Sequence, residues 1–458
     1  MKSCKEEISC PSNALNCTFS QDIKRLADKL KQDLIDFSTH PFSKKILITP
    51  SQPIKDYLID FFAKELGIVT GIQFLSLKQV INEWLFSFGK KIPDSIEISL
   101  VLEEIIEQSW QKDETSKLYS YIACEEESKR SKRMIGLSDH LSNIFEEYGT
   151  YGLHFLPAWT KKSGWQQTLW SQIFSSHPNW TYPLDAAKFL QTQNKSIFVF
   201  GFSFLPLSYL QILKQVGALF YFFSPCELFW EDVHTDRERK KKKKKLAQRG
   251  ISIKKREELN HYDAAAHPLL ANWGKLGRTF LKNLDLFSLI STELYELKKE
   301  NTNLQKLQEQ ILYFKRAEPI SQADSSLQLH SAPTKLREVE VLCDTLLTLI
   351  QKNSIKLDQI IVLAPDITMY APYIEMIFAN HPLPYTIENV AVFSNSAAHG
   401  FLLLKKVLDE NFSLNSIYAL LDETIFCTKQ SWSPDRSKQI KQWLETASIR
   451  QEGDACNW

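Results

Sequence analysis

The sequence lacks the loop with which nucleotide-hydrolysing motors hold phosphate. Such a loop has the pattern Gly-x-x-x-x-Gly-Lys-Ser/Thr, because glycine backbone N–H groups surround the phosphates while the lysine and the hydroxyl meet charge and Mg²⁺. The first expected strand-to-helix turn, Thr18–Asp22, contains neither glycine nor lysine. The nearest match, Gly274-Lys275, continues with Leu276 and has no glycine loop before it. This absence argues against ATP hydrolysis by the chain.

Carboxylates are also missing where metal-dependent chemistry would need them. In a motor, a strand like the apolar one that ends at Phe200 carries a carboxylate at its tip, which holds Mg²⁺ and positions water. Here Gly201 and Phe202 follow instead. Nucleases need carboxylates that converge on a metal pair, and no expected strand carries such a set. The sequence therefore predicts no catalytic residue, no metal site and no ATP site in this chain.

No Cys-x-x-Cys pair occurs among the eight cysteines. Cys4, Cys10 and Cys17 are spaced closely enough to suggest a metal or iron–sulfur site, but no histidine and no fourth ligand lie nearby. His261 and His267 flank a five-residue gap before a proline, which favours a loop over a metal site. Scattered thiols, together with an N-terminus that has no apolar core for secretion, predict a reducing, cytoplasmic location.

Charge is distributed unevenly, although the formal net charge is only +1. Residues 237–256 carry twelve lysine or arginine residues and one glutamate, so the rest of the chain is net acidic. The expected state of this segment is a solvated loop held open by charge repulsion, with no aromatic residues interleaved for base stacking. Contact with DNA phosphates is the alternative, and its candidate residues are Lys240, Lys241, Lys242 and Lys243.

A run of eighteen uncharged residues extends from Ser196 to Leu213, near the lower limit for a membrane span. Gly201, Pro206, Gln211 and turn chemistry in its middle favour a strand followed by a helix, with no membrane contact.

Strands alternate with helices in the first part of the chain, which predicts βαβ units and a parallel sheet. Strands are expected at 15–19, 45–49, 71–74, 196–200 and 219–223, with helices at 22–37, 54–67, 77–88 and after Gly201. Residues 93–192 have helical periodicity, and the tryptophans there are expected to lie in a helical core rather than to stack on bases. These tryptophans are Trp110, Trp159, Trp165, Trp170 and Trp180.

Further helices are expected at about 266–315, and a second α/β unit follows. It comprises 327–333, a helix at 335–350, a strand at 359–366 and a helix at 369–380, and later helices lie at 396–408, 413–421 and 433–446. The predicted domains are a discontinuous α/β domain at 1–92 and 193–320, a helical insertion at 93–192, and a second, incomplete α/β domain at 321–458.

Several stretches carry a more specific pattern. Residues 267–284 read HPLLANWGKLGRTFLKNL, and they stand with VFGFSFLPLSYLQIL at 199–213, SPCELFWEDV at 224–233, KLREVEVLCDTLL at 335–347 and IIVLAPDITMYAPYIEMIF at 360–378. KILITPSQPIKDYLIDFFAKELGI and INEWLF come before them. In this order, across nearly the whole chain, they resemble the RecC family, the gamma chain of bacterial exodeoxyribonuclease V.

The resemblance implies an inactivated superfamily 1 helicase-like α/β fold, with P-loop-like parallel sheets and a helical insertion domain. ILITPSQPIKDYL then corresponds to a DNA-touching motif of the first helicase domain and FVFGFSF to the Walker B strand. IIVLAPD corresponds to a second-domain motif in which Pro365-Asp366 replaces an expected arginine.

The resemblance also implies partners. The family's subunit works in a heterotrimer with RecB-like beta and RecD-like alpha chains, which use ATP and Mg²⁺, and one of which carries the nuclease. It holds double-stranded DNA ends, splits the duplex and guides a single strand through a tunnel where a hotspot sequence is sensed.

Implied DNA contacts are Thr49 and Ser51 in the first motif, and Asn143, Ile144, Glu146 and Glu147 at DNA-sensing positions. Lys275 and Arg278, at a glycine-rich helix start, are candidates for phosphate contact, with packing of the Trp273-Gly274 turn as the structural alternative.

Three departures from the family pattern bear on this implication. The loop Thr49–Asp56 has one extra residue and two prolines, and Gly152 and Tyr182 stand where family arginines are expected. Family members are also about twice as long, so a fragment, half of a split gene and a decayed remnant are all open. The alternatives to a DNA-guiding subunit are a working helicase or nuclease and a protein–protein adaptor without DNA contact.

Overall fold

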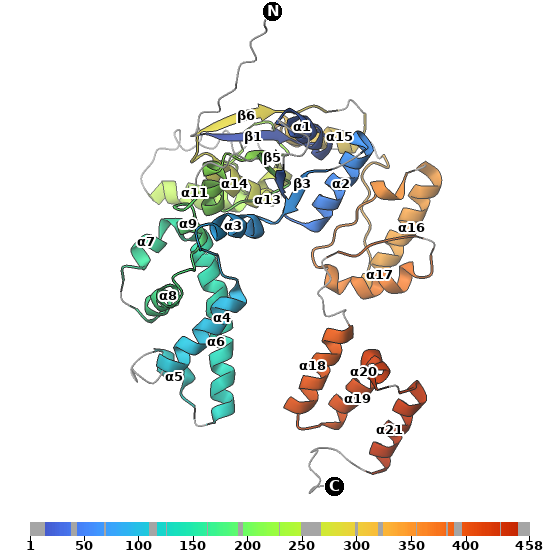
Figure 1. Ribbon diagram of the computed structural model, residues 1–458. Coiled ribbons are helices and arrows are strands. Elements are labelled where there is room, and N and C mark those ends of the chain that lie inside the picture. The colour runs from blue at the N-terminus through green and yellow to red at the C-terminus, as the bar shows by residue number, and fades with distance from the viewer. Residues whose placement is uncertain are drawn as a thin grey trace, which may run out of the picture. The chain divides into compact units, whose positions relative to one another are not determined.

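The computed structural model divides the chain into two compact units, Met1–Leu327 (unit 1) and Gln328–Trp458 (unit 2) (Figure 1). The division falls close to the predicted boundary at residue 320. The residues that the structure describes are 14–37, 44–67, 70–109, 117–124, 126–162, 164–190, 196–228, 230–248, 267–297, 301–318, 324–353, 355–381, 383–388, 396–430 and 432–447.

Unit 1 is built on a six-stranded sheet in which every pairing is parallel. The strands are β1 (Leu15–Ser20), β2 (Lys45–Ile48), β3 (Ile72–Leu75), β4 (Ile197–Phe200), β5 (Leu219–Phe223) and β6 (Leu289–Glu293), in the order β3-β2-β4-β5-β1-β6. The α/β class and the first five strands are confirmed. The sixth strand was not predicted, because a helix was expected across its residues.

Helices connect the strands. In unit 1 they are α1 (Ile23–Asp36), α2 (Gln52–Leu66), α3 (Leu77–Phe86), α4 (Ser95–Ser109), α5 (Lys117–Ile122), α6 (Glu127–Tyr151), α7 (Leu156–Trp159), α8 (Trp165–Ser176), α9 (Pro183–Ala186), α10 (Leu207–Gln215), α11 (Asp236–Gln248), α13 (Pro268–Trp273), α14 (Lys275–Leu284) and α15 (Asn303–Leu312). Gly67 closes α2 at φ +74°, as the sequence predicts, because only glycine adopts this conformation without strain.

Strand alternation divides the apolar side chains between the two faces of the sheet. On β4, Phe198 and Phe200 point to one face, where they join Leu47 and Tyr221 in a core covered by α1 and α2. Both faces are buried, which explains why β4 reads as an uninterrupted apolar run.

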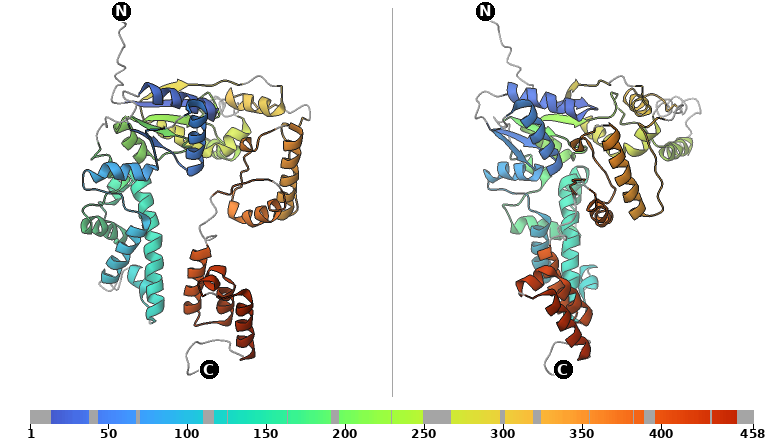
Figure 2. Two further views of the ribbon diagram at one scale, coloured as in Figure 1. Left: turned by 45° about the vertical axis from the view of Figure 1, so that its right-hand side comes forward. Right: turned by 90° about the vertical axis from the view of Figure 1, so that its right-hand side faces the viewer.

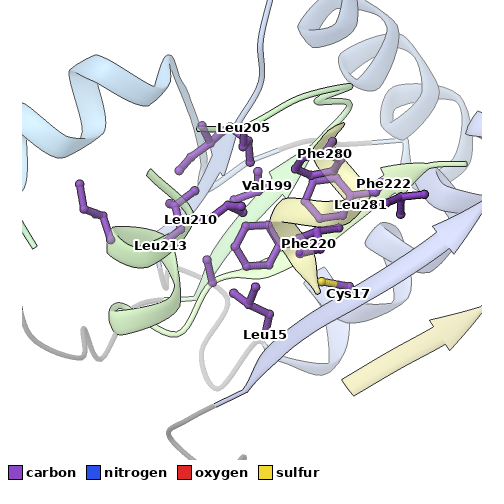
Figure 3. Close-up of a cluster of buried hydrophobic side chains, with 14 of the residues drawn as sticks. Leu15, Cys17, Val199, Leu205, Leu210, Leu213, Phe220, Phe222, Phe280 and Leu281 are labelled. Carbon is purple, nitrogen blue, oxygen red and sulfur yellow. The ribbon is translucent and has the colours of Figure 1, made fainter. Parts of the chain in front are cut away.

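The other face carries the larger core, which contains Val199 of β4, Phe220 and Phe222 of β5, and side chains of α3, α10, α13 and α14. Figure 3 shows Leu210 and Leu213 of α10 and Phe280 and Leu281 of α14 gathered on this face. The uncharged run 196–213 is therefore a core strand, a turn at Gly201 and the start of α10, as predicted. Among the residues that the structure describes, no helix is long and apolar enough to cross a membrane.

The predicted helical region is confirmed. Helices α4, α5, α6 and α8 form a core of their own, and α6 runs away from the sheet in both views of Figure 2. Trp170 and Trp180 are buried in this core, and Trp159 and Trp165 pack against it, so their predicted core role is confirmed. Trp110 lies outside the described residues.

Unit 2 contains α16 (Lys335–Asn353), α17 (Ala371–Phe378), α18 (Ser396–Asp409), α19 (Leu414–Asp422), α20 (Thr424–Lys429), α21 (Pro434–Thr446) and two short 3₁₀ turns, Leu357–Gln359 and Ile367–Met369. Its helices lie close to their predicted ranges. The predicted strand at 359–366 and the start of an α/β unit at 327–333 are wrong, because no described residue of unit 2 belongs to a β-strand. Ile361 and Leu363 are more than four-fifths exposed, so these apolar residues have neither a paired strand nor a covering layer.

Candidate nucleic-acid interface

The carboxyl edge of the parallel sheet is where α/β proteins of this class place ligands. At the end of β1 this edge is occupied by the chain's own polar groups. Ser20 Oγ donates to the Leu294 carbonyl at 2.8 Å, and Gln21 Nε2 donates to the carbonyl of Glu296. Asp22 caps α1, its carboxylate accepting from the Lys24 N–H at 2.8 Å. A carboxylate already holds the helix N-terminus, and its negative charge repels a phosphate there.

The helices that follow the neighbouring strands β2 and β4 lie on opposite faces of the sheet. The carboxyl ends of these two strands therefore form a switch point, the place where the direction of the chain connections reverses. Gly201, directly after β4, has φ +80°. A Cβ added to Gly201 would stand 3.0 Å from Ile54 Cδ1 and 3.8 Å from Pro50 Cδ. Apolar side chains from the loop after β2 (Pro50) and from the first turn of α2 (Ile54) therefore occupy the space beside Gly201. A carboxylate in place of Gly201 would meet Ile54 rather than a solvated metal.

Two candidate DNA contacts lie on the loop after β2. Thr49 is buried, and its N–H donates to the Leu75 carbonyl at 3.3 Å, which ties the loop to β3. Ser51 is exposed at the N-cap of α2, and its hydroxyl makes no capping hydrogen bond. Of the two side chains, only that of Ser51 is presented to solvent.

The Trp-Gly-Lys-Leu-Gly-Arg motif forms the junction between α13 and α14. A Cβ at Gly274 would lie 2.4 Å from Trp230 Cζ3, and one at Gly277 would lie 2.7 Å from Trp230 Cη2. Trp230 is 3% exposed, so its indole packs directly on the backbone of this junction. The two glycines are required for this close approach, and phosphate binding is not needed to explain them.

An apolar hollow of about 270 Å³ lies beside this junction at the carboxyl ends of β4 and β5. Its lining includes Phe202, Phe222, Trp230 and Phe280, with Trp273 four-fifths exposed. No acidic residue lines it, so the hollow offers no carboxylate to Mg²⁺.

The two cations of the motif differ in placement. Lys275 is exposed on the first turn of α14. Arg278 is 6% exposed, and its guanidinium donates to the Val233 carbonyl and, at 3.2 Å, to Glu238. The Arg278 side chain is therefore held inside the protein, whereas that of Lys275 is free to meet solvent.

The basic segment corrects one expectation. A solvated loop was predicted, but Asp236–Gln248 form helix α11, while 249–256 lie outside the described residues. The first turn explains the difference. The Thr235 N–H donates to Glu238 Oε2 at 2.8 Å, and the Glu238 N–H donates to Thr235 Oγ1 at 3.2 Å, a reciprocal capping box.

Several lysines project from this helix. Lys240, Lys241, Lys244 and Lys245 are exposed, whereas the side chains of Lys242 and Lys243 lie outside what the structure describes. The hydrogen bond from the Thr235 N–H is the main cause of a lowered pKa of Glu238, about 2, to which Arg278 adds. Glu238 therefore stays ionised at neutral pH beside the lysine run.

The four candidate positions on α6 occupy different environments. Asn143 and Glu147 are exposed, although the Asn143 amide donates to the Asp139 carbonyl at 2.8 Å. Ile144 packs against the helical core. Glu146 pairs with Lys78 of α3 at 3.0 Å. Because α3 begins at the carboxyl end of β3, this ion pair places Glu146 at the same edge of the sheet as the loop after β2.

The cysteines and histidines weighed as metal ligands lie only partly within the described residues. Cys17 lies in the sheet core, where burial raises the pKa of its thiol to about 12, while Cys4 and Cys10 lie outside the described residues. His267 Nδ1 accepts from the Leu269 N–H and caps α13, and His261 lies outside the described residues. Within the described ranges, no group of three or more His, Cys, Asp or Glu side chains is arranged to hold a metal ion.

Comparison with known proteins shows to which family the sequence belongs. The model of the RecC N-terminal domain matches residues 15–314, most of unit 1 and more than half of the chain. The chain belongs to the RecC family.

Individual RecC proteins are distant in sequence. The chain is 24% identical to the RecBCD enzyme subunit RecC of Escherichia coli (strain K12), over 90% of this chain and 42% of that protein. The corresponding subunit of Haemophilus influenzae is also 24% identical, over 90% of this chain and 44% of that protein. That of Mycolicibacterium smegmatis is 24% identical over 76% of this chain. The chain spans less than half the length of these RecC relatives.

Membership of the RecC family confirms the resemblance drawn from the motifs. Three residues that shape the site were not singled out by sequence reasoning, namely Asp22, Ile54 and Trp230. Asp22 had a readable signal, since an aspartate directly before an amphipathic helix is a common N-cap. Ile54 and Trp230 act through tertiary contacts with glycines, and no local pattern announces them.

Proposed function

We propose that this chain is a non-catalytic, DNA-guiding scaffold subunit of an exodeoxyribonuclease V helicase–nuclease of the RecBCD type, acting at double-strand DNA ends in recombinational repair. The observation that carries the proposal is the combination of RecC family membership with a sheet edge where Asp22 caps α1 and Ile54 packs beside Gly201. Its partners would be RecB-like and RecD-like chains in the cytoplasm, which would use the ATP and Mg²⁺ of the reaction.

The scaffold of unit 1 would be an inactivated superfamily 1 helicase-like domain. Its parallel sheet suits a nucleotide-binding fold, but Asp22 occupies the α1 N-terminus and Ile54 occupies the switch point beside Gly201. Both features disfavour phosphate and Mg²⁺ for physical reasons, namely like charge and apolar packing. The chain would therefore bind no nucleotide of its own.

DNA contact would come from two exposed polar surfaces. One is α11, whose exposed lysines neutralise phosphates and gain from counterion release. The other comprises exposed residues of two elements, Ser51 at the N-cap of α2 and Asn143 and Glu147 on α6. The protein would hold a duplex end and an emerging single strand by their sugar-phosphate backbones. The α11 lysines would read little sequence, since phosphate contacts position nucleic acid without reading bases.

The first experiment is co-expression with RecB-like and RecD-like chains of the source cell. Stable co-purification and binding of blunt duplex ends by the trimer are expected. A trimer that never forms would overturn the subunit assignment. Binding of a fluorescent ATP analogue by the isolated chain would overturn the non-catalytic assignment.

The second experiment concerns the lysines. Changing Lys240–Lys245 to glutamine in the trimer should weaken binding to DNA ends and reduce the dependence of log K on log salt. Each lost phosphate contact lowers that slope by about 0.9. An unchanged affinity and slope would remove α11 from the DNA surface.

A second function is favoured by a specific observation. Arg278 and Thr49 are buried, and Glu146 is ion-paired, so several predicted DNA contacts serve the fold itself. This would suit a protein–protein adaptor without DNA contact. A trimer that assembles but fails to bind DNA ends would favour the adaptor.

A further inference from the structure

We infer that the buried Arg278 is a positioning residue that fixes the basic helix α11 to α14, so that its lysines form a surface of fixed orientation. The inference rests on the proposed DNA contact for its consequence in binding, but the fixed orientation of the helix itself stands on contacts within unit 1.

The anchor is a chain of three residues. The guanidinium of Arg278, 8% exposed in its side chain, donates to the Val233 carbonyl and to Glu238 Oε2. The same Glu238 oxygen accepts the Thr235 N–H, and Thr235 Oγ1 accepts the Glu238 N–H. One carboxylate thus closes the first turn of α11 and joins it to a helix some forty residues further along the chain.

The anchor is needed because the remaining residues of α11 disfavour a helical conformation. Six consecutive lysines repel one another, and like charges at i and i+4 destabilise an isolated helix. A short helix is also marginal in water without tertiary packing. A buried guanidinium, in turn, is costly unless a carboxylate pairs with it, so Arg278 and Glu238 each stabilise the other's position.

Helical geometry gives the consequence for binding. Residues four apart share a face, so Lys240 and Lys244 form one pair and Lys241 and Lys245 form another, turned by about 100°. All four are exposed. If the segment were a flexible polycation, loss of either lysine pair would reduce DNA affinity equally, because the charge change is the same. If the helix is held in one orientation, loss of the pair that faces DNA would reduce the affinity more than loss of the other pair.

The orientation is tested in the trimer with the paired variants K240Q/K244Q and K241Q/K245Q. Binding to a blunt duplex is measured between 50 and 200 mM salt, over which each phosphate contact accounts for about a 3.5-fold change in affinity. The expected result is that one pair changes the salt slope by about 1.8 and the other by less than about half of that. Equal effects of the two pairs would overturn the fixed orientation.

The anchor is tested by removing its carboxylate. Glu238→Ala increases the net positive charge, so charge alone predicts tighter DNA binding. The fixed orientation predicts instead that the difference between the two lysine pairs disappears in this background. Glu238→Gln keeps an acceptor for the Thr235 N–H but loses the charge, and it should give an intermediate result. Survival of the full difference in Glu238→Ala would overturn the anchor.

A readout without DNA separates this inference from the proposed function. Limited trypsin digestion of the full chain, with cleavage after residues 239–245 followed by mass spectrometry, should be slow in the wild type, faster in Glu238→Gln and fastest in Glu238→Ala. Glu309→Gln is the matched control, since Glu309 is also about half exposed and pairs with Lys315 at 2.7 Å. It should leave these cleavages unchanged.

If Glu238→Ala is cleaved no faster than this control, the anchor is refuted whatever the DNA result. If Lys240–Lys245→Gln leaves DNA binding intact while Glu238→Ala is cleaved faster, the proposed DNA contact fails and the anchor stands.

Discussion

Replacement of Gly201 by alanine tests directly whether apolar packing has closed the switch point. Two costs are expected. At φ +80° an L-residue loses about 1–2 kcal/mol because Cβ crowds the backbone. The new methyl would also stand 3.0 Å from Ile54 Cδ1 and 3.1 Å from Ile54 Cγ2, and overpacking of this kind costs about 1–3 kcal/mol. The free energy of unfolding should therefore fall by about 2–5 kcal/mol.

The matched control is Gly217→Ala. Gly217 has φ +74°, and nothing lies within 4 Å of an added Cβ, so only the backbone cost of about 1–2 kcal/mol applies. Ile54→Ala removes both contacting atoms. It should therefore be less destabilising in the Gly201→Ala background than in the wild type, by about 1–3 kcal/mol.

Urea unfolding of the four variants and the wild type, followed by tryptophan fluorescence, measures these differences. Equal losses in Gly201→Ala and Gly217→Ala would refute the contact argument. The same refutation would follow if the Ile54 and Gly201 substitutions were simply additive, because additivity means that the two side chains do not meet.

Three further predictions concern the core and the anchor. Tyr221→Phe removes the hydroxyl that donates to Asp33 Oδ2 at 2.5 Å in the buried core, and should lower the free energy of unfolding by about 1.5–3 kcal/mol, measured by urea titration. Gly277→Ala would place a methyl 2.7 Å from the buried ring of Trp230, and should lower it by up to about 2 kcal/mol in the same assay, the overpacking cost of about 1–3 kcal/mol less the helix-propensity gain of about 1 kcal/mol. The pKa of Glu238 is about 2, below its ordinary 4.5, so its carboxylate stabilises the fold fully above pH 4.5 and loses that effect as pH falls toward 2. The difference in urea midpoint between the wild type and Glu238→Gln should therefore shrink across this window.

Controls make each outcome decisive. Gly136→Ala, in the middle of α6 with nothing within 4 Å of its added Cβ, should stabilise by about 1 kcal/mol, in contrast to Gly277→Ala. If both glycine variants shift stability in the same direction, the Trp230 contact is wrong. An Asp33→Asn, Tyr221→Phe double variant should show strong coupling, and independence would contradict the hydrogen bond. A Glu238→Gln difference that is constant from pH 6 to pH 3 would contradict the lowered pKa.

Much of the sheet was predictable because its strands are buried on both faces. β2, β4 and β5 are short apolar runs next to turn signals, and such runs are readable without tertiary information. β6 escaped notice because its residues Ile290–Glu293 are exposed and mostly polar. An edge strand of this composition is fixed by pairing with β1 rather than by its own pattern.

Two errors show where local pattern fails. The residues at 359–366 have the apolar content of a strand, but Ile361 and Leu363 are exposed, and no strand in the described part of the chain pairs with them. The basic segment 237–256 has the composition of an open loop, but its described part, up to Gln248, is a helix whose first turn is capped by Glu238 and joined to the distant Arg278. Residues 359–366 lack a contact with a described partner strand, and the basic segment has a contact with a distant arginine. In both cases the conformation depends on contacts that the local sequence does not show.

The absence of phosphate-binding and metal-binding residues from the site was predictable from the sequence. The side chains that occupy their places were much less predictable. Missing glycines and carboxylates can be read directly from the chain. The packing of Ile54 against Gly201, and of Trp230 against Gly274, depends on segments that are far apart in sequence. A glycine indicates that something approaches closely, but it does not identify the neighbour.

The filled switch point beside Gly201 has a mechanical consequence. Motor domains move because a bound ligand favours one of two arrangements of packed elements, and a ligand can shift such an equilibrium only through differential affinity. Ile54 and Pro50 pack against Gly201 and so join the start of α2 to the end of β4. In the scaffold role proposed above, unit 1 would keep one shape while a partner motor works. It would then be the stationary support against which force on a strand is developed.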